Sequence, residues 1–366
     1  MGNSGIQQDP LATPGPASVV GRPALLAIDW GTSRLRGALL GAGGTVLAER
    51  SLPRGLLQVP AGTWPAVFVE GFGDWLRAWP HLPGLMAGMV GSRQGWVEAP
   101  YCDCPASVAD LAARLTWVSS PVAPPVAPPV TPPTAGQIAE PIAGPTGVRE
   151  PGERSARPLA IVPGLAWHGE GPPDLMRGEE TQVFGALQLL APSLGPADRA
   201  DALLLLPGTH SKWVQVRQGR VVGFRSHMTG ESYALFRRYS ILARGLPALD
   251  ESVDEPFIAS AFDDGAARAQ QPGGLLHHLF GVRSLGLFDR AAPADLASYL
   301  SGLVIGEELR AQGVAAGSSV IVVGSEALTL RYARALGSMG VPVHSVGAEA
   351  SWRGLWALAS AATMTR

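Results

Sequence analysis

The sequence predicts an α/β protein of two domains, because one pattern of strands and glycine turns occurs twice along the chain. The first copy spans 24–49 and turns at Gly31–Ser33, and the second spans 202–224 and turns at Pro207–His210. Short apolar runs joined by tight glycine turns are typical of antiparallel meanders. A chain of 366 residues is also too long for one ordinary core and fits two domains.

Further apolar patterns predict the elements that accompany each meander. Helical spacing and short buried runs indicate helices over 64–79, 179–190, 294–311, 326–336 and 349–361, and strands over 85–90, 160–162, 320–325 and 341–346. We expect a disordered tail over 1–23, an N-terminal domain over 24–200 with a proline-rich insertion at about 119–158, and a C-terminal domain over 201–366. An interdomain cleft is the expected place for a ligand.

Composition argues against several classes of partner. Hydrophobic residues make up 46% of the chain, and its net charge of −2 lacks the basic excess that nucleic acids or acidic membranes require. No apolar stretch approaches the ~20 residues of a membrane span, and the first residues lack the pattern of a signal peptide. Cys102 and Cys104 are expected to be free thiols in a reducing cytoplasm. We therefore expect a cytoplasmic protein that acts on a small molecule, while the sequence specifies no oligomeric state.

The first turn carries groups suited to a phosphate. Gly31 allows close backbone approach, and the amides and hydroxyls of Thr32 and Ser33 can donate to phosphate oxygens. Asp29, at the end of the preceding strand, could hold a hydrated Mg²⁺. A plain β-turn with a local aspartate has the same pattern, so this segment alone does not decide between the two readings.

The second turn repeats this logic and adds a cation. Gly208, Thr209 and His210 lie between two strands, and Lys212 follows. It is the only lysine among 28 basic residues. An ammonium is a compact, mobile charge that can follow a phosphoryl group, whereas a guanidinium is a rigid fork. Either a catalytic role or chance retention explains the lysine, and we favour the first.

Two adjacent carboxylates, Glu179 and Glu180, begin a predicted helix after Gly178. They could simply complement the helix dipole. One of them could instead accept a hydroxyl proton during phosphoryl transfer. Arg177 could pair with a substrate carboxylate or with these glutamates.

Two further segments are candidates for ligand contacts. Gly324 and Ser325 form a glycine turn at a predicted helix start, which suits packing against an adenosine. The loop over 91–101 offers hydroxyl, guanidinium, amide and indole groups to a sugar from Ser92, Arg93, Gln94 and Trp96, although a packing loop would look similar. The chain has no G-x-x-x-x-G-K-[ST] segment, no Gly-x-Ser-x-Gly elbow and no histidine pair with zinc spacing.

Together these segments resemble the 2-dehydro-3-deoxygalactonate kinases of the actin/Hsp70/sugar-kinase superfamily. The resemblance runs from about Leu25 to about Ala361, outside the proline-rich insertion. It is carried by AIDWGTSRLRG at 27–37, MAGMVGSRQGWVEAPY at 86–101, MRGEETQ at 176–182, LPGTHSKWV at 206–214 and HMTGE at 227–231. The resemblance implies two ribonuclease-H-like (actin-like ATPase) domains.

The resemblance also implies an activity. It is the ATP- and Mg²⁺-dependent phosphorylation of 2-dehydro-3-deoxy-D-galactonate at its terminal C6 hydroxyl, giving the 6-phosphate and ADP, in galactonate or galactose breakdown. A kinase for another sugar or sugar acid is the alternative, and a non-catalytic actin-type nucleotide-binding protein is a more distant one.

By position, the resemblance makes 29–33 and 206–213 the two phosphate segments and 323–327 the adenosine segment. Related sugar kinases carry a catalytic aspartate before a helix upstream of the second phosphate segment, and Glu179-Glu180 stand in that place here. We prefer Glu179 as the base because it directly follows Gly178. Arg36, Arg93 and Arg177 are the candidates for binding the substrate carboxylate, and sequence does not rank them.

Overall fold

The computed structural model describes residues 15–16, 19–122, 158–195, 201–248, 255–315 and 317–365. Most of the predicted tail over 1–23 and most of the proline-rich insertion lie outside these residues. The chain forms two compact units. Unit 1 comprises Met1–Ala166, Met176–Gly185 and Ser351–Arg366, and unit 2 comprises Trp167–Leu175 and Ala186–Ala350.

These units differ from the predicted boundary between residues 200 and 201. The chain passes between them several times, so the last helix belongs to unit 1 and not to the C-terminal domain in which we expected it. The reason lies in packing inside unit 1. Trp352 donates from Nε1 to Glu49, and Arg353 donates to the carbonyl of Gly43 at 2.7 Å.

The sheet of unit 1 begins with the predicted meander. The antiparallel strands β1 (Leu25–Trp30), β2 (Leu35–Leu40) and β3 (Val46–Leu52) are followed in the sheet by β4 (Gly84–Gly88) and β7 (Leu159–Ile161), both parallel to β1, and by β6 (Thr116–Val118), antiparallel to β7. The order is β3-β2-β1-β4-β7-β6. Every residue of β1 except Asp29 is buried, as expected for an apolar central strand.

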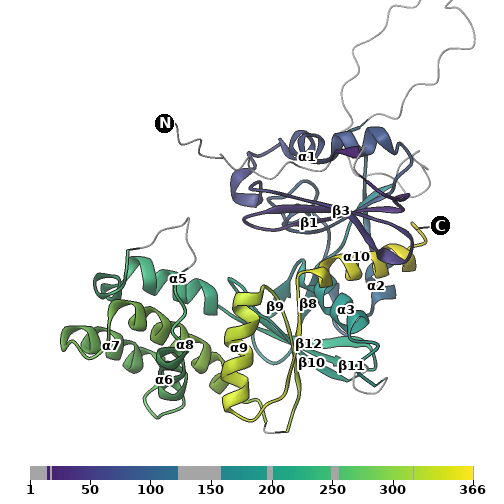
Figure 1. Cartoon of the computed structure of the whole chain (residues 1–366). Helices are drawn as coiled ribbons and strands as arrows, with labels where there is room; N and C mark the ends of the chain where they lie inside the picture. Colours follow the sequence, from purple (N-terminus) through teal and green to yellow (C-terminus); the bar gives the residue numbers. More distant parts are fainter. Residues whose placement is uncertain are drawn as a thin grey trace, which may run out of the picture. The chain divides into compact units, whose positions relative to one another are not determined.

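Two helices cover the two faces of this sheet in Figure 1, α1 (Trp64–Ala78) and α10 (Glu349–Ala361). The apolar face of α1 contributes Phe68, Phe72 and Trp75, each fully buried, to the core of unit 1. The short helices α2 (Val108–Ala112) and η2 (Ala42–Gly44), η3 (Leu56–Gln58) and η4 (Met89–Gly91) lie in connecting segments, and α3 (Glu179–Leu189) starts in unit 1. A small sheet has the order β5 (Cys102–Asp103), β8 (Leu165–Trp167) and β9 (Asp174–Met176), and Cys102 and Cys104 are free.

The sheet of unit 2 repeats the strand order of unit 1. It consists of the antiparallel strands β10 (Ala202–Leu206), β11 (Ser211–Arg217) and β12 (Arg220–His227), followed by β13 (Val320–Val323) and β14 (Val343–Val346), which are parallel to β10. The order is β12-β11-β10-β13-β14. An antiparallel meander continued by two parallel strands therefore occurs twice, which confirms the prediction of two ribonuclease-H-like domains in an actin-like fold.

The helices of unit 2 include a group that the sequence pattern did not predict. Besides the predicted α8 (Pro293–Gln312) and α9 (Glu326–Ser338), the chain forms α5 (Thr229–Tyr239), η5 (Ile241–Gly245), α6 (Ala259–Ala269) and α7 (Gly274–Leu287), which gather with α8 on one side of the unit in Figure 1. They share a core of their own that includes Leu242, Leu279 and Leu300. Within the described part of the chain, no helix is both long and apolar enough to span a lipid bilayer.

Candidate active site

The turn after β1 presents unpaired donors at the carboxyl edge of the unit 1 sheet. The amide of Gly31 donates to the carbonyl of Arg34 at 2.9 Å and closes the turn. Thr32 and Ser33 are exposed, and within the described ranges their amides make no hydrogen bond. Two N–H groups and two hydroxyls are therefore available, which is what a phosphate-binding turn requires.

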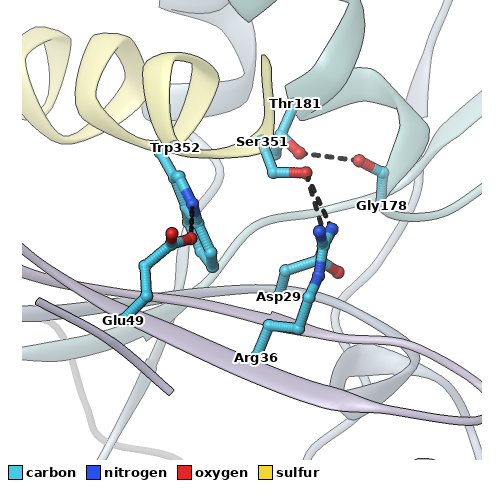
Figure 2. A network of polar contacts seen from close by, with 7 residues as sticks. All are labelled: Asp29, Arg36, Glu49, Gly178, Thr181, Ser351 and Trp352. Carbon is cyan, nitrogen blue, oxygen red and sulfur yellow. Dashed lines mark hydrogen bonds and ion pairs between the residues drawn. The ribbon is translucent and has the colours of Figure 1, made fainter. Parts of the chain in front are cut away.

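Asp29 is held from two sides, as Figure 2 shows. Its Oδ2 forms an ion pair with Arg36, which lies opposite it in the β1–β2 register, and accepts a hydrogen bond from the Ser351 hydroxyl at 3.0 Å. The guanidinium of Arg36 also lies 5.6 Å from the ring centre of Trp352 in α10. Arg36 was a candidate for binding the substrate carboxylate, but in the structure it already neutralises Asp29.

The second oxygen of Asp29 matters for a magnesium ion. Oδ1 makes no hydrogen bond to any described residue. The described ranges hold no group of three or more metal-ligating side chains. Mg²⁺ commonly takes one or two carboxylates and fills its other positions with water and substrate phosphates, so a lone, positioned carboxylate fits this ion.

The predicted pair of glutamates begins α3. Gly178 precedes them at φ +107°, a conformation that glycine adopts without a steric cost, and it lies against Gly88 at the end of β4. Glu179 accepts from the amide of Arg177 at 3.0 Å, and Glu180 accepts from the amide of Gly178 at 2.6 Å. Both carboxylates therefore satisfy backbone donors at a helix N-terminus, where negative charge is also favoured by the helix dipole.

The two glutamates differ in exposure and in protonation. Glu180 is completely buried, and its Oε1 has no hydrogen-bond partner. Burial, reinforced by the neighbouring charge of Glu179, raises the pKa of Glu180 to about 8. Glu180 therefore carries a proton at neutral pH. Glu179 is partly exposed.

The loop after β4 divides its predicted ligand residues between different environments. β4 ends at Gly88, two residues before the predicted end, because Gly88 adopts φ +92° and a 3₁₀ turn follows. Ser92 keeps a buried hydroxyl without a partner, whereas the side chain of Arg93 is 88% exposed and Gln94 is exposed. Trp96 is partly buried and packs on Phe68 with ring centres 5.4 Å apart, and its sugar contact stays a prediction.

In unit 2, the predicted phosphate and adenosine segments lie at one sheet edge. β10 and β13 are parallel neighbours, so the turn after Leu206 and the turn after Val323 leave the sheet side by side. Gly324 lies against Pro207, because a Cβ on Gly324 would be 3.6 Å from the Pro207 ring. Thr209, His210 and Ser325 are exposed at this edge.

His210 is not isolated. Its Nε2 lies 2.6 Å from Glu231 near the start of α5, and the amide of Glu231 donates to the carbonyl of Thr209 at 2.9 Å. The HMTGE segment at 227–231, which the sequence resemblance included without a role, therefore braces the second phosphate turn.

Lys212 occupies a different place from the one predicted. Only 6% of the residue is exposed. Its ammonium donates to the carbonyl of Leu175 at 2.9 Å and to the hydroxyl of Ser226, its cross-strand partner. Ser226 in turn donates to Asp174 at 2.6 Å through both its hydroxyl and its amide. The lone lysine thus fastens strand β9 to the β11–β12 hairpin, which is not the mobile position that the sequence suggested.

A second buried polar group of unit 2 was not predicted at all. Glu308 in α8 is 3% exposed and accepts from Trp213 Nε1 at 2.7 Å, from the Tyr332 hydroxyl at 2.6 Å and from the Thr229 hydroxyl. These donors come from β11, α9 and α5, so one carboxylate ties together the elements that carry the candidate nucleotide turns. The only sequence signal was a glutamate in the apolar run GLVIGEEL.

Two actin-like units, each with a glycine turn at the carboxyl edge of its sheet, and a glutamate pair at a helix start define a phosphotransferase of the sugar-kinase class. Residues 29–358 match the family model described as 2-keto-3-deoxy-galactonokinase. The chain belongs to this family, which confirms the resemblance seen in the sequence and makes the protein a sugar-acid kinase.

Relatives of this family match over nearly their whole length. The chain is 36% identical to a probable 2-dehydro-3-deoxygalactonokinase of Rhizobium meliloti strain 1021, over 92% of this chain and 96% of that protein. It is 31% identical to the 2-dehydro-3-deoxygalactonokinase of Escherichia coli K12, over 90% and 94% respectively. A crystal structure described as that of a 2-dehydro-3-deoxygalactonokinase protein from Sinorhizobium meliloti matches with a TM-score of 0.73 at 36% identity. The match covers 92% of this chain and 98% of that one.

Proposed function

We propose that the protein transfers the γ-phosphoryl group of ATP to the terminal C6 hydroxyl of 2-dehydro-3-deoxy-D-galactonate, in the catabolism of galactonate or galactose. The observation that carries this proposal is the family match over residues 29–358, which includes both glycine turns and the glutamate pair. The substrate is the one in the names of two relatives that are 36% and 31% identical to this chain. An ATP-consuming catabolic step of this kind belongs in the cytoplasm.

The donors found in each unit have assigned roles in this proposal. In unit 1, the amides and hydroxyls of Thr32 and Ser33 bind phosphate oxygens. In unit 2, the turn over 207–210 binds phosphate and Gly324-Ser325 packs on the adenosine, since both lie at the carboxyl edge of one sheet. Phosphoryl transfer relies mainly on such positioning and charge stabilisation, because the protein supplies little covalent chemistry.

The chemical step needs one proton acceptor. The C6 oxygen bonds to the γ-phosphorus while the bond from that phosphorus to the bridging oxygen of ADP breaks, and the hydroxyl proton passes to a carboxylate. We assign this role to Glu179, because it is partly exposed, whereas the buried Glu180 is already protonated at neutral pH. Glu180 then stabilises the start of α3 by accepting the hydrogen bond from the amide of Gly178.

Asp29 is the residue that would hold Mg²⁺. Arg36 and Ser351 both bind Oδ2, so Oδ1, which makes no hydrogen bond to a described residue, would hold the ion or one of its waters. When bound, the ion supplies positive charge that neutralises the phosphate oxygens.

A coupled assay of ADP release tests the proposal. The panel contains 2-dehydro-3-deoxy-D-galactonate, its gluco epimer, the corresponding aldonates without the 2-oxo group, and neutral hexoses. We expect turnover with the galacto acid at a kcat/KM at least about tenfold above every other compound. A higher value for another sugar or sugar acid would reassign the substrate, and ATP turnover indifferent to all of them would reject a sugar-acid kinase.

The assignment of the base has its own test. We expect E179Q to reduce kcat by about 100-fold or more, with little change in nucleotide affinity, because the carboxylate acts in the chemical step. The exposed E70Q, also in unit 1, is the control. Near-normal turnover in E179Q would exclude Glu179 as the base.

A further inference from the structure

The carboxylate of a sugar acid needs a cationic partner, and the structure ranks the three candidate arginines. Arg36 is paired with Asp29, and Arg93 is an exposed side chain paired with Glu98 at 3.2 Å. Arg177 forms no ion pair with any described residue. It is therefore the candidate whose guanidinium has no carboxylate within ion-pair distance among the described residues.

The guanidinium of Arg177 is held in one orientation. It stacks on Tyr101, with its Cζ 4.3 Å from the ring centre, and donates from Nη2 to the carbonyl of Ala99 at 2.7 Å. The neighbouring Glu179 and Glu180 bind the backbone amides at 177 and 178, not this guanidinium. A planar fork fixed before binding loses little entropy when it meets a planar anion.

The remaining donors of this group are unsatisfied. Nε and Nη1 of Arg177 are shielded from solvent and have no hydrogen-bond partner, and the same is true of the Ser92 hydroxyl in the adjacent loop. Buried donors without partners cost free energy that a suitable acceptor recovers. Gly91 adjoins this place, since a Cβ there would be 2.9 Å from Nη1, and the side chain of any other residue would crowd the fork.

The geometry of a guanidinium leaves a bidentate edge open. The two hydrogens of Nη2 point toward opposite edges, one shared with Nε and one shared with Nη1, and the Ala99 carbonyl takes one of them. Whichever hydrogen that carbonyl takes, the other edge still offers two parallel N–H donors. A carboxylate accepts two parallel N–H bonds from such an edge.

We propose that Arg177, with the hydroxyl of Ser92, binds the C1 carboxylate of the sugar-acid substrate. The inference rests on the proposed function, because it assumes that the acceptor is a sugar acid. Binding requires a local movement around this guanidinium, since its Nε and Nη1 are shielded from solvent. The site is thus specific for a carboxylate and selects acids over neutral sugars.

The test compares the acid with an uncharged analogue of the same shape. Wild type, R177Q and R93Q are assayed for ADP release with 2-dehydro-3-deoxy-D-galactonate and with its C1 primary amide. We expect wild type to prefer the acid by about 100-fold or more in kcat/KM, because a buried charge pair is lost with the amide. R177Q should lower kcat/KM for the acid by a similar factor while changing the amide value less than about fivefold. R93Q should keep the wild-type preference.

Several results would overturn the proposal. Equal use of acid and amide by wild type would show that no carboxylate site exists, and this arm needs no variant. Equal losses on both compounds in a folded R177Q would show a structural role only. If R177Q does not fold, R177K replaces it, because it keeps the charge but loses the fork, and an unchanged preference in R177K contradicts the proposal. Absence of turnover with any sugar acid is a separate outcome that removes the proposed function itself.

Discussion

The protonation of Glu180 predicts that α3 becomes less stable as the pH rises, and that E180Q removes this dependence. Glu180 is neutral in the folded protein up to a pKa of about 8, whereas its ordinary pKa is 4.5. Between these two values the unfolded chain loses the proton and the folded chain keeps it. Folding stability is therefore greatest below the lower value and falls as the pH approaches the higher one. Glutamine is neutral at every pH and keeps an oxygen for the amide of Gly178.

The size of the effect follows from the shift. Each pH unit in this window changes the free energy of unfolding by about 1.4 kcal/mol for one proton. From pH 5.5 to the folded pKa of about 8, wild type should lose about 3 kcal/mol relative to E180Q. Because glutamine matches the protonated carboxyl, the two proteins should be equally stable only below the ordinary pKa of 4.5. E180Q should be the more stable by about 1.4 kcal/mol at pH 5.5 and by about 4 kcal/mol at the folded pKa.

Hydrogen exchange followed by mass spectrometry measures this change where it occurs. A protein of two units rarely unfolds in a single two-state step, so the opening of α3 is followed through the peptide over 176–189 at pH 5.5–8.5, after correction for intrinsic exchange rates. The exposed E70Q in unit 1 is the control and should track wild type. Parallel curves for wild type and E180Q, differing by less than about 0.5 kcal/mol across the range, would refute the argument that the native carboxyl is protonated.

Three further variants test other contacts. K212M should destabilise unit 2 by about 2–4 kcal/mol in urea unfolding, because two bonds from a buried ammonium are lost, while ATP affinity stays within about threefold. If K212M loses ATP affinity more than stability, the fastening role of Lys212 is contradicted. A D174N variant with unchanged stability would contradict it as well. S351A should raise the Mg²⁺ concentration for half-maximal activity several-fold, whereas S360A, an exposed serine of the same helix, should not, and equal behaviour of the two would argue against a link to Asp29. E308Q should lower unit 2 stability by about 2–4 kcal/mol in thermal unfolding, because an amide can no longer accept from all three donors, and an unchanged melting temperature would speak against the network.

Sequence periodicity predicted the two meanders because their strands are short, apolar and bounded by glycine turns, whereas it missed β6 and the small sheet of β5, β8 and β9. Both meanders occur where expected. The group α5–α7 was missed because its apolar residues face a small separate core, and their spacing is broken by glycines and exposed apolar side chains such as Leu276 and Phe280. The assignment of α10 to unit 1 depends on contacts between residues some 300 positions apart, which no local pattern contains.

In the candidate site too, contacts set by local strand pairing could be predicted from the sequence, and contacts set by the tertiary fold could not. The Asp29–Arg36 pair was within reach of sequence reasoning, because a two-strand hairpin with a short turn places these residues opposite each other. The buried position of Lys212 could not be predicted from the sequence, since the rarity of a residue type says nothing about its surroundings. Its acceptors, Leu175 and Ser226, are defined only by how the strands pair.

The return of the last helix to unit 1 has a consequence for biosynthesis. The surface of unit 1 that receives Ser351 and Trp352 is made early, yet these residues follow the whole of Ala186–Ala350. At ribosomal speeds of about 5–20 residues per second, that surface waits about 10–30 s for its helix. Unit 2 is synthesised in that interval, while the surface of unit 1 that α10 will cover stays open to chaperones. An N-terminal fragment ending near residue 200 would remain permanently in that unfinished state.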